Sequence, residues 1–202
     1  YHLRRVISYI ASFPEVEKIN IIAHSRGTDV AVTALRELTI AARAEGVQTR
    51  EKYKIHNFVL AAPDLDAQVF VQRIVGDFLT LSADRFTIYT SPGDKAIGWS
   101  GKLFASPKGR IGNLEVADLP EELQKGMERS SSNLAIVNFR SSSDKSASTA
   151  DRFRHSYFRN APTVSSDLIL MLRDDLDPGP PGRPLEYLGS KFWLVPSGYP
   201  AS

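Results

Sequence analysis

The sequence predicts an α/β protein in which helices cover both faces of a mostly parallel sheet. Short, nearly uninterrupted apolar runs recur along the chain, and amphipathic runs of helical periodicity separate them. Strands that are apolar on both sides are typical of parallel sheets buried under helices. Regular alternation of strand and helix is typical of the crossover connections that such a sheet requires.

The elements follow one another in this alternation. Strands are expected at residues 19–23, 58–62, 86–90 and 134–139, and helices at residues 3–11, 28–44, 67–79, 120–129 and 164–173. The expected buried faces are Leu3, Val6, Ile7, Ile10 and Ala11 in the first helix, Val30, Ala34, Leu38 and Ala41 in the second, and Phe70, Ile74 and Phe78 in the third. Gly46 is placed to end the second helix.

The chain is expected to form one domain with an appended tail. Residues 1–176 carry the alternating pattern, whereas residues 177–202 are rich in Pro and Gly and are expected to be extended, docking Phe192 and Trp193 on the body. Because the strand expected at residues 19–23 is the first one in the sequence, we expect at least two further strands to precede it in a longer chain. Residues 1–176 would then be the carboxyl-terminal part of their domain.

Composition excludes several classes of protein. A net charge of +2, from 25 basic and 23 acidic residues, gives no reason to expect nucleic acid as a partner. The absence of cysteine excludes disulfides and thiolate sites. No apolar run reaches the roughly 20 residues of a transmembrane helix. The sequence leaves localisation open between the cytoplasm and an exported or membrane-associated state.

A serine stands where the first strand turns into the second helix. In AHSRG, residues 23–27, Ser25 is flanked two positions away by Ala23 and Gly27, small residues expected because strand and helix nearly touch. This is the pattern of a nucleophile elbow with alanine in place of the first glycine. We predict that Ser25 is a nucleophile and that the backbone N–H of Arg26 is an oxyanion donor. The alternative is a serine that only caps the helix.

A serine nucleophile needs a histidine base, and the chain has four histidines. His2 precedes the elbow, His24 is the immediate neighbour of Ser25, and His56 leads into the second strand at the end opposite the elbow. His155 follows the last strand, where the order serine, acid, histidine requires the base. A surface histidine in a basic patch is the alternative interpretation of His155.

The acid should follow a strand between Ser25 and His155, because only the carboxyl ends of parallel strands face the elbow. Asp94 lies in a tight turn directly after the third strand and is the favoured residue. Asp64 and Asp66, which follow the second strand, stay open as alternatives.

Several stretches occur together and in order over about residues 18–172: IIAHSRGTDV, FVLAAPDLDAQVF, FTIYTSPGDKAIGWSGKLF with GRIG, and HSYF. This combination resembles a bacterial family of α/β hydrolases of unknown function that is esterase- or lipase-like. The resemblance implies an α/β-hydrolase fold with Ser25, Asp94 and His155 as the triad, and little about the substrate. The chain departs from the fold's pattern in lacking the early strands and the early loop that normally supplies a second oxyanion donor.

The favoured function is therefore that of a serine hydrolase acting on a carboxylic ester or lipid-like acyl substrate through an acyl-enzyme, without cofactor or metal. A phosphate loop around Lys102 lacks its first glycine and its Ser/Thr, and no cluster has metal-ligand spacing. Trp99 and Phe104, in the insertion of residues 95–120, are candidates for a wall of the acyl pocket. The alternative function is a catalytically inactive binding or scaffold module with the same fold.

Overall fold

The described strands form one mostly parallel sheet. The structure, a computed structural model, describes residues 1–65, 71–91, 133–139, 161–196 and 198–199. Within them the strand order is β1-β2-β3-β4-β6-β5. The strands are β1 (Ile19–His24), β2 (Ile55–Ala61), β3 (Arg85–Thr90), β4 (Leu134–Asn138), β5 (Glu186–Gly189) and β6 (Phe192–Leu194). All neighbours pair in parallel except β5 and β6, which are antiparallel, so the predicted sheet is confirmed.

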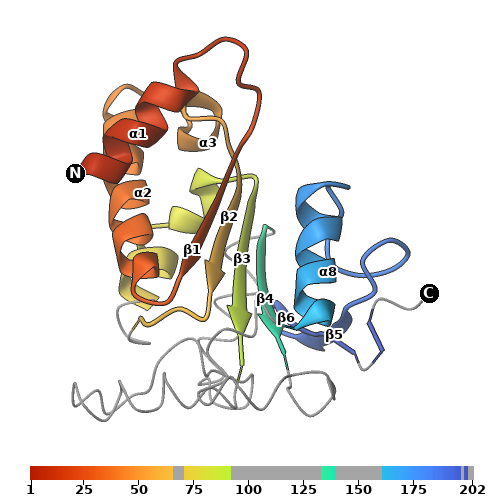
Figure 1. Ribbon diagram of the computed structural model, residues 1–202. Helices are drawn as coiled ribbons and strands as arrows, with labels where there is room; N and C mark the ends of the chain where they lie inside the picture. The colour runs from red at the N-terminus through yellow and green to blue at the C-terminus, as the bar shows by residue number, and fades with distance from the viewer. Residues whose placement is uncertain (66–70, 92–132, 140–160, 197, 200–202) are drawn as a thin grey trace.

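Helices lie on both faces of this sheet, as predicted. On one face are α1 (His2–Ala11), α2 (Gly27–Ala44) and the short α3 (Thr49–Lys52), and on the other is α8 (Pro162–Leu172) (Figure 1). Each face has its own apolar core: α1 and α2 pack on β1 to β4, and α8 packs on β2, β3 and β4. Among the described residues, no helix combines the length and the apolar character needed to cross a bilayer.

The carboxyl end of α2 follows its sequence signal. Gly46 has a φ of +71°, and its N–H donates to the carbonyl of Arg43 at 3.1 Å. The N–H of Val47 donates to the carbonyl of Ala42 at 3.0 Å. These two bonds form a Schellman motif, in which glycine adopts the left-handed conformation without a Cβ clash.

The buried face of α2 differs from the predicted one. Ala34 and Leu38 are buried as expected, but Val30 is 58% exposed. Ala31 and Leu35 are buried in its place. Because apolar residues occupy neighbouring positions around this helix, the periodicity leaves its rotation undetermined and packing against the sheet selects it.

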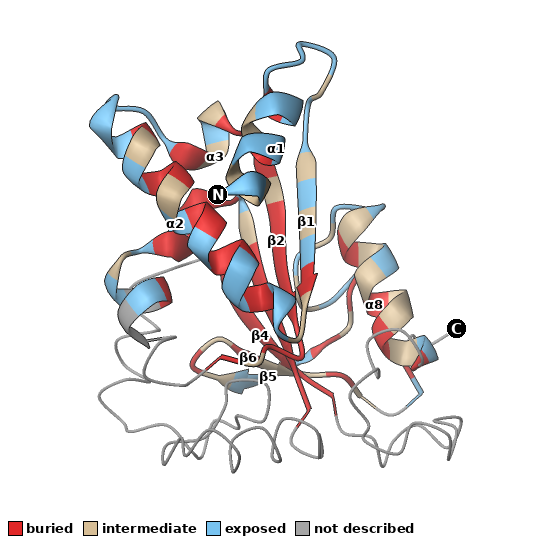
Figure 2. Ribbon diagram, turned by 60° about the vertical axis from the view of Figure 1, so that its left-hand side comes forward, coloured by how far each residue is buried: buried red, intermediate tan, exposed pale blue. Residues whose placement is uncertain are grey.

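The buried face of α1 is narrower than predicted. Ile7 and Ala11 are buried and Leu3 packs partly against the core, whereas Val6 and Ile10 are exposed. Figure 2 shows α1 with one buried side and a largely exposed outer surface. The helix packs against α2, so it contributes a single i, i+4 stripe to the core.

The third predicted helix is wrong over its described part. A π-helix, Val71–Gly76, and a 3-10 helix, Leu79–Ser82, replace one continuous α-helix. Phe78 between them is left-handed, with a φ of 54°, and is exposed, while Ile74 is buried as expected. Arg36 of α2 donates to the Asp77 carboxylate at 2.8 Å, and Arg43 donates to the Asp77 carbonyl at 2.7 Å. These two hydrogen bonds hold Asp77 against α2 at the point between the π-helix and the 3-10 helix where the helix is interrupted. Phe70 lies outside the described residues.

The segment after α8 adds strands to the sheet. β6 pairs with β4 in the register Ile136 to Phe192 and Val137 to Trp193. Phe192 is fully buried and Trp193 is half-buried. The docking of Phe192 and Trp193 on the body was expected from the sequence, whereas the pairing of β6 with β4 was not predicted. The division of the chain at residue 176 stays a prediction.

A buried ion pair attaches the tail to the body. The Arg183 guanidinium donates two hydrogen bonds of 2.8 Å to the Asp167 carboxylate of α8, and both side chains have no exposed surface. The hydroxyls of Tyr89 in β3 and Tyr199 in the tail donate to the same carboxylate at 2.5 and 2.6 Å. Burial, with the Asp167 charge nearby, raises the pKa of both tyrosines. This cluster joins α8, β3 and the tail.

A second, more exposed charge cluster lies at the amino ends of the strands. The Asp175 carboxylate, just after α8, accepts a hydrogen bond of 2.8 Å from Lys18, lies 2.6 Å from Nε2 of His56, and also pairs with Arg85. The hydrogen bonds from Lys18 and Arg85 hold the pKa of Asp175 well below its usual range. The cluster fixes the loop after α8 against the beginnings of β2 and β3.

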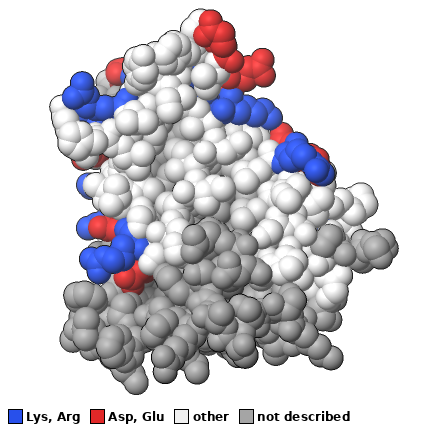
Figure 3. Space-filling view, in the orientation of Figure 1, with Lys and Arg blue, Asp and Glu red and all other residues white. Residues whose placement is uncertain are grey.

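β1 has a strand partner, β2, on one side only within the described residues. Its alternate residues Asn20 and Ile22 are exposed, Ile22 to 46%. Figure 3 shows the molecule in the orientation of Figure 1, and on the face in view the charged side chains of the described residues lie mainly at the rim. Further strands beside β1 stay a prediction.

Candidate functional site

Ser25 lies at the junction of β1 and α2, where the sequence predicts it. β1 ends at His24, and α2 begins at Gly27. Ser25 has a φ of 53°, in the left-handed region that residues other than glycine rarely adopt. A strained serine between a strand and a helix is the geometry of a nucleophile elbow. The Ser25 residue is half-buried, so it is not enclosed in the core.

Backbone hydrogen bonds hold Ser25 in this conformation. Its N–H donates to the carbonyl of Ala61 in β2 at 3.1 Å, which continues the β1–β2 pairing past the end of β1. Its carbonyl accepts from the Thr28 N–H at 3.1 Å, the Thr28 hydroxyl at 2.5 Å and the Asp64 N–H at 3.4 Å. Thr28 is fully buried and was not singled out from the sequence. Its place three residues after the serine is the signal that could have identified it.

Only one of the two small residues that flank Ser25 lies at a close contact. Ala23 is buried in the core beside α2, as a small residue at a close contact would be. A Cβ built on Gly27, however, would meet no atom of the described residues within 4 Å. Close contact between strand and helix therefore does not explain the glycine at position 27. Arg26 is exposed and forms the N-cap of α2.

The other candidate residues divide between described and undescribed parts of the chain. Asp94, His155, Asp66, Trp99 and Phe104 lie outside the described residues, so their roles stay predictions. Of the alternative acids, only Asp64 is among the described residues. It is half-buried, and its backbone N–H donates to the Ser25 carbonyl at 3.4 Å.

His56 lies far from the elbow along the sheet, as predicted. It is the second residue of β2, at the amino end, whereas Ser25 follows the carboxyl end of the parallel strand β1. Its Nδ1 lies 2.8 Å from the Asp84 carboxylate and its Nε2 lies 2.6 Å from Asp175. Its ring is therefore engaged in the charge cluster.

The conformation of Ser25 predicts a gain of stability on substitution. Changing Ser25 to glycine should raise the free energy of unfolding by about 1 kcal/mol, because a left-handed residue with a Cβ costs roughly that much. Urea denaturation followed by circular dichroism measures the change. Gly27→Ala is the control, because Gly27 is a helical glycine of ordinary φ with space for a methyl group. It measures how much stability changes when a glycine is exchanged at an unstrained position, through the entropy of the unfolded chain alone. A destabilised Ser25→Gly protein would contradict the assignment of strain.

A parallel sheet with helices on both faces and a left-handed serine between β1 and α2 defines an α/β-hydrolase fold. The family model described as "Alpha/beta hydrolase of unknown function (DUF900)" matches residues 1–173, and the chain belongs to this family. The resemblance to a family of α/β hydrolases of unknown function, drawn from the sequence motifs, is thereby confirmed. No curated protein and no solved structure significantly matches the chain.

Proposed function

We propose that the chain is a serine hydrolase of carboxylic esters or lipid-like acyl compounds. The observation that supports this most directly is the left-handed Ser25 between β1 and α2, held by four hydrogen bonds to its backbone. Such strain at a polar, half-buried residue is typical of functional sites. Membership of an α/β-hydrolase family supports the same class of reaction.

In the proposed reaction, Oγ of Ser25 attacks the ester carbonyl carbon while His155 accepts the hydroxyl proton. The N–H of Arg26 donates a hydrogen bond to the oxyanion. Collapse of the tetrahedral intermediate breaks the bond to the alcohol, which leaves with the proton from His155. Water, activated by the same histidine, then hydrolyses the acyl-enzyme. Asp94 orients the imidazole, and Trp99 and Phe104 contribute to the acyl pocket.

A fluorophosphonate tests the nucleophile without knowledge of the substrate. We expect one covalent adduct per chain, and peptide mass spectrometry should locate it on Ser25. The reason is that the reagent phosphonylates only a serine whose proton is removed by an adjacent base.

Two variants make the labelling specific. Ser25→Ala should abolish the adduct, whereas Ser12→Ala, at an exposed serine just after α1, should leave it unchanged. Circular dichroism should show both variants folded. Undiminished labelling of Ser25→Ala would refute the assignment, and a folded chain without any adduct would favour the binding or scaffold module.

A further inference from the structure

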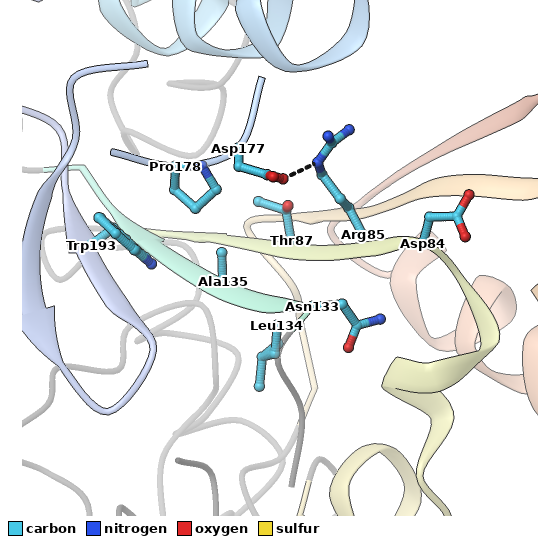
Figure 4. Close-up of a pocket in the computed structure, with 9 residues that line it drawn as sticks. All are labelled: Asp84, Arg85, Thr87, Asn133, Leu134, Ala135, Asp177, Pro178 and Trp193. Carbon is cyan, nitrogen blue, oxygen red and sulfur yellow. Dashed lines mark hydrogen bonds and ion pairs between the residues drawn. The ribbon is translucent and has the colours of Figure 1, made fainter. Parts of the chain in front are cut away.

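A pocket of about 380 Å³ lies at the end of the sheet opposite Ser25. Its floor is formed by Thr87 of β3 and Ala135 of β4, and Pro178 lies above them (Figure 4). Trp193 stands at one end of the pocket and Arg85 at the other. The volume is within the range of small-molecule sites. The lining also carries the carboxylates of Asp84 and Asp177, and the Asp84 carboxylate lies 2.8 Å from Nδ1 of His56. Trp193 and Pro178, facing Arg85 across the pocket, suit an amphipathic ligand.

Arg85 is held rigidly at its end of the pocket. Its side chain is only 16% exposed. Nη2 donates to the backbone carbonyl of Asp175 at 2.7 Å, and Nη1 pairs with the Asp175 carboxylate. Lys18 and His56 hold Asp175 in turn. The guanidinium is therefore fixed by contacts that do not involve the pocket.

The third donor of the Arg85 guanidinium, Nε, binds the carboxylate of Asp177, a residue that lines the pocket. Nε of Arg85 donates to Asp177 at 2.6 Å, and the Asp177 side chain is 78% exposed. A ligand carboxylate in the place of Asp177 would keep an acceptor on Nε, so the exchange leaves the mostly buried Arg85 paired. Displaced Asp177 would return to water at small cost.

A cationic ligand would act differently. Because a carboxylate has two oxygens, a cation could pair with Asp177 while Asp177 stays on Arg85, as Asp175 pairs with Lys18 and Arg85 together. Only an anion can take the place of Asp177 as the acceptor at Nε of Arg85. Trp193 and Pro178 would contact the apolar body of that anion.

We propose that this pocket binds a small carboxylate with a flat apolar body, which replaces Asp177 at Nε of Arg85 and packs against Trp193. This site is separate from the proposed hydrolase site, because Arg85 begins β3 whereas Ser25 follows the far end of β1. Asp177 is then an internal competitor for the ligand.

Phenylacetate is the probe, with phenylacetamide and phenethylammonium as neutral and cationic analogues of similar shape. The chain has two tryptophans, so a Trp99→Phe background leaves Trp193 as the fluorescent reporter. Phenylacetate should quench or shift Trp193 emission saturably at millimolar concentration, and both analogues should bind more weakly. Asp177→Asn should tighten phenylacetate binding by about fivefold, because the ligand no longer has to displace a carboxylate from Arg85.

Matched variants separate this site from a general effect of charge. Asp174→Asn removes the same charge three residues away, from an exposed pair with Arg173 outside the pocket, and should leave binding unchanged. Arg85→Lys keeps the charge but loses the planar donor edge, and should weaken binding severalfold. The proposal would be overturned if phenylacetate and phenylacetamide bound equally well, or if phenethylammonium bound best. It would also be overturned if phenylacetate binding to Asp177→Asn did not saturate, or if Asp174→Asn and Asp177→Asn had equal effects.

Discussion

Replacing Asp94 by asparagine is expected to lower kcat for ester hydrolysis about 10⁴-fold, the loss typical of a triad whose histidine is held in the wrong tautomer. In the proposed reaction, the amide could not stabilise the imidazolium that would form when His155 accepts the Ser25 proton. Stopped assays with p-nitrophenyl acetate measure kcat, and the rate of fluorophosphonate labelling of Ser25 should fall in parallel.

Asp64→Asn is the matched control for this prediction. Asp64 contacts the elbow through its backbone N–H, which donates to the Ser25 carbonyl at 3.4 Å, and asparagine keeps that contact. We therefore expect kcat to change little. If Asp64→Asn lost activity and Asp94→Asn did not, the acid would belong to the loop after β2 instead of the loop after β3.

Changing Arg183 to methionine is expected to lower the free energy of unfolding by about 3–5 kcal/mol. The substitution leaves the Asp167 carboxylate buried without its cation, and the two tyrosine hydroxyls that remain cannot neutralise it. Urea denaturation measures the loss. Adding Asp167→Asn should recover part of it, because the uncharged amide no longer needs a counterion.

Arg173→Met tests whether burial is the cause. Arg173 also makes two hydrogen bonds to an aspartate, Asp174, but its side chain is 72% exposed. Its loss should cost less than about 1 kcal/mol. Equal costs for the two arginines would contradict the role given to the buried pair.

The tail and the part of the chain matched by the family model meet at this buried ion pair. The family match ends at residue 173, whereas Arg183 and Tyr199, two of the groups that bind Asp167, follow it. The tail therefore supplies the counterion for a buried carboxylate of α8. It also supplies β6, which pairs with β4 at what would otherwise be an edge of the sheet.

Local sequence was sufficient for the central architecture. The apolar runs of β1, β3 and β4 gave their positions to within a residue or two, and the serine was placed at the turn after β1. These features have signals among near neighbours in the sequence: an uninterrupted apolar run in a strand buried on both faces, and glycine at a helix end. The candidate nucleophile could be chosen for the same reason, because the elbow is a continuous five-residue turn.

Long-range packing decided the rest. Val30 and Ala31 are both apolar, and only the docking of α2 on the sheet makes one exposed and the other buried. Arg183 lies in a Pro- and Gly-rich segment with no periodic signal, yet it is fully buried because Asp167, sixteen residues earlier, neutralises it. The pocket between Arg85 and Trp193 likewise joins residues more than a hundred positions apart. Charge pairing and pocket shape depend on contacts between residues that are distant in the sequence. Local residue patterns therefore do not predict them.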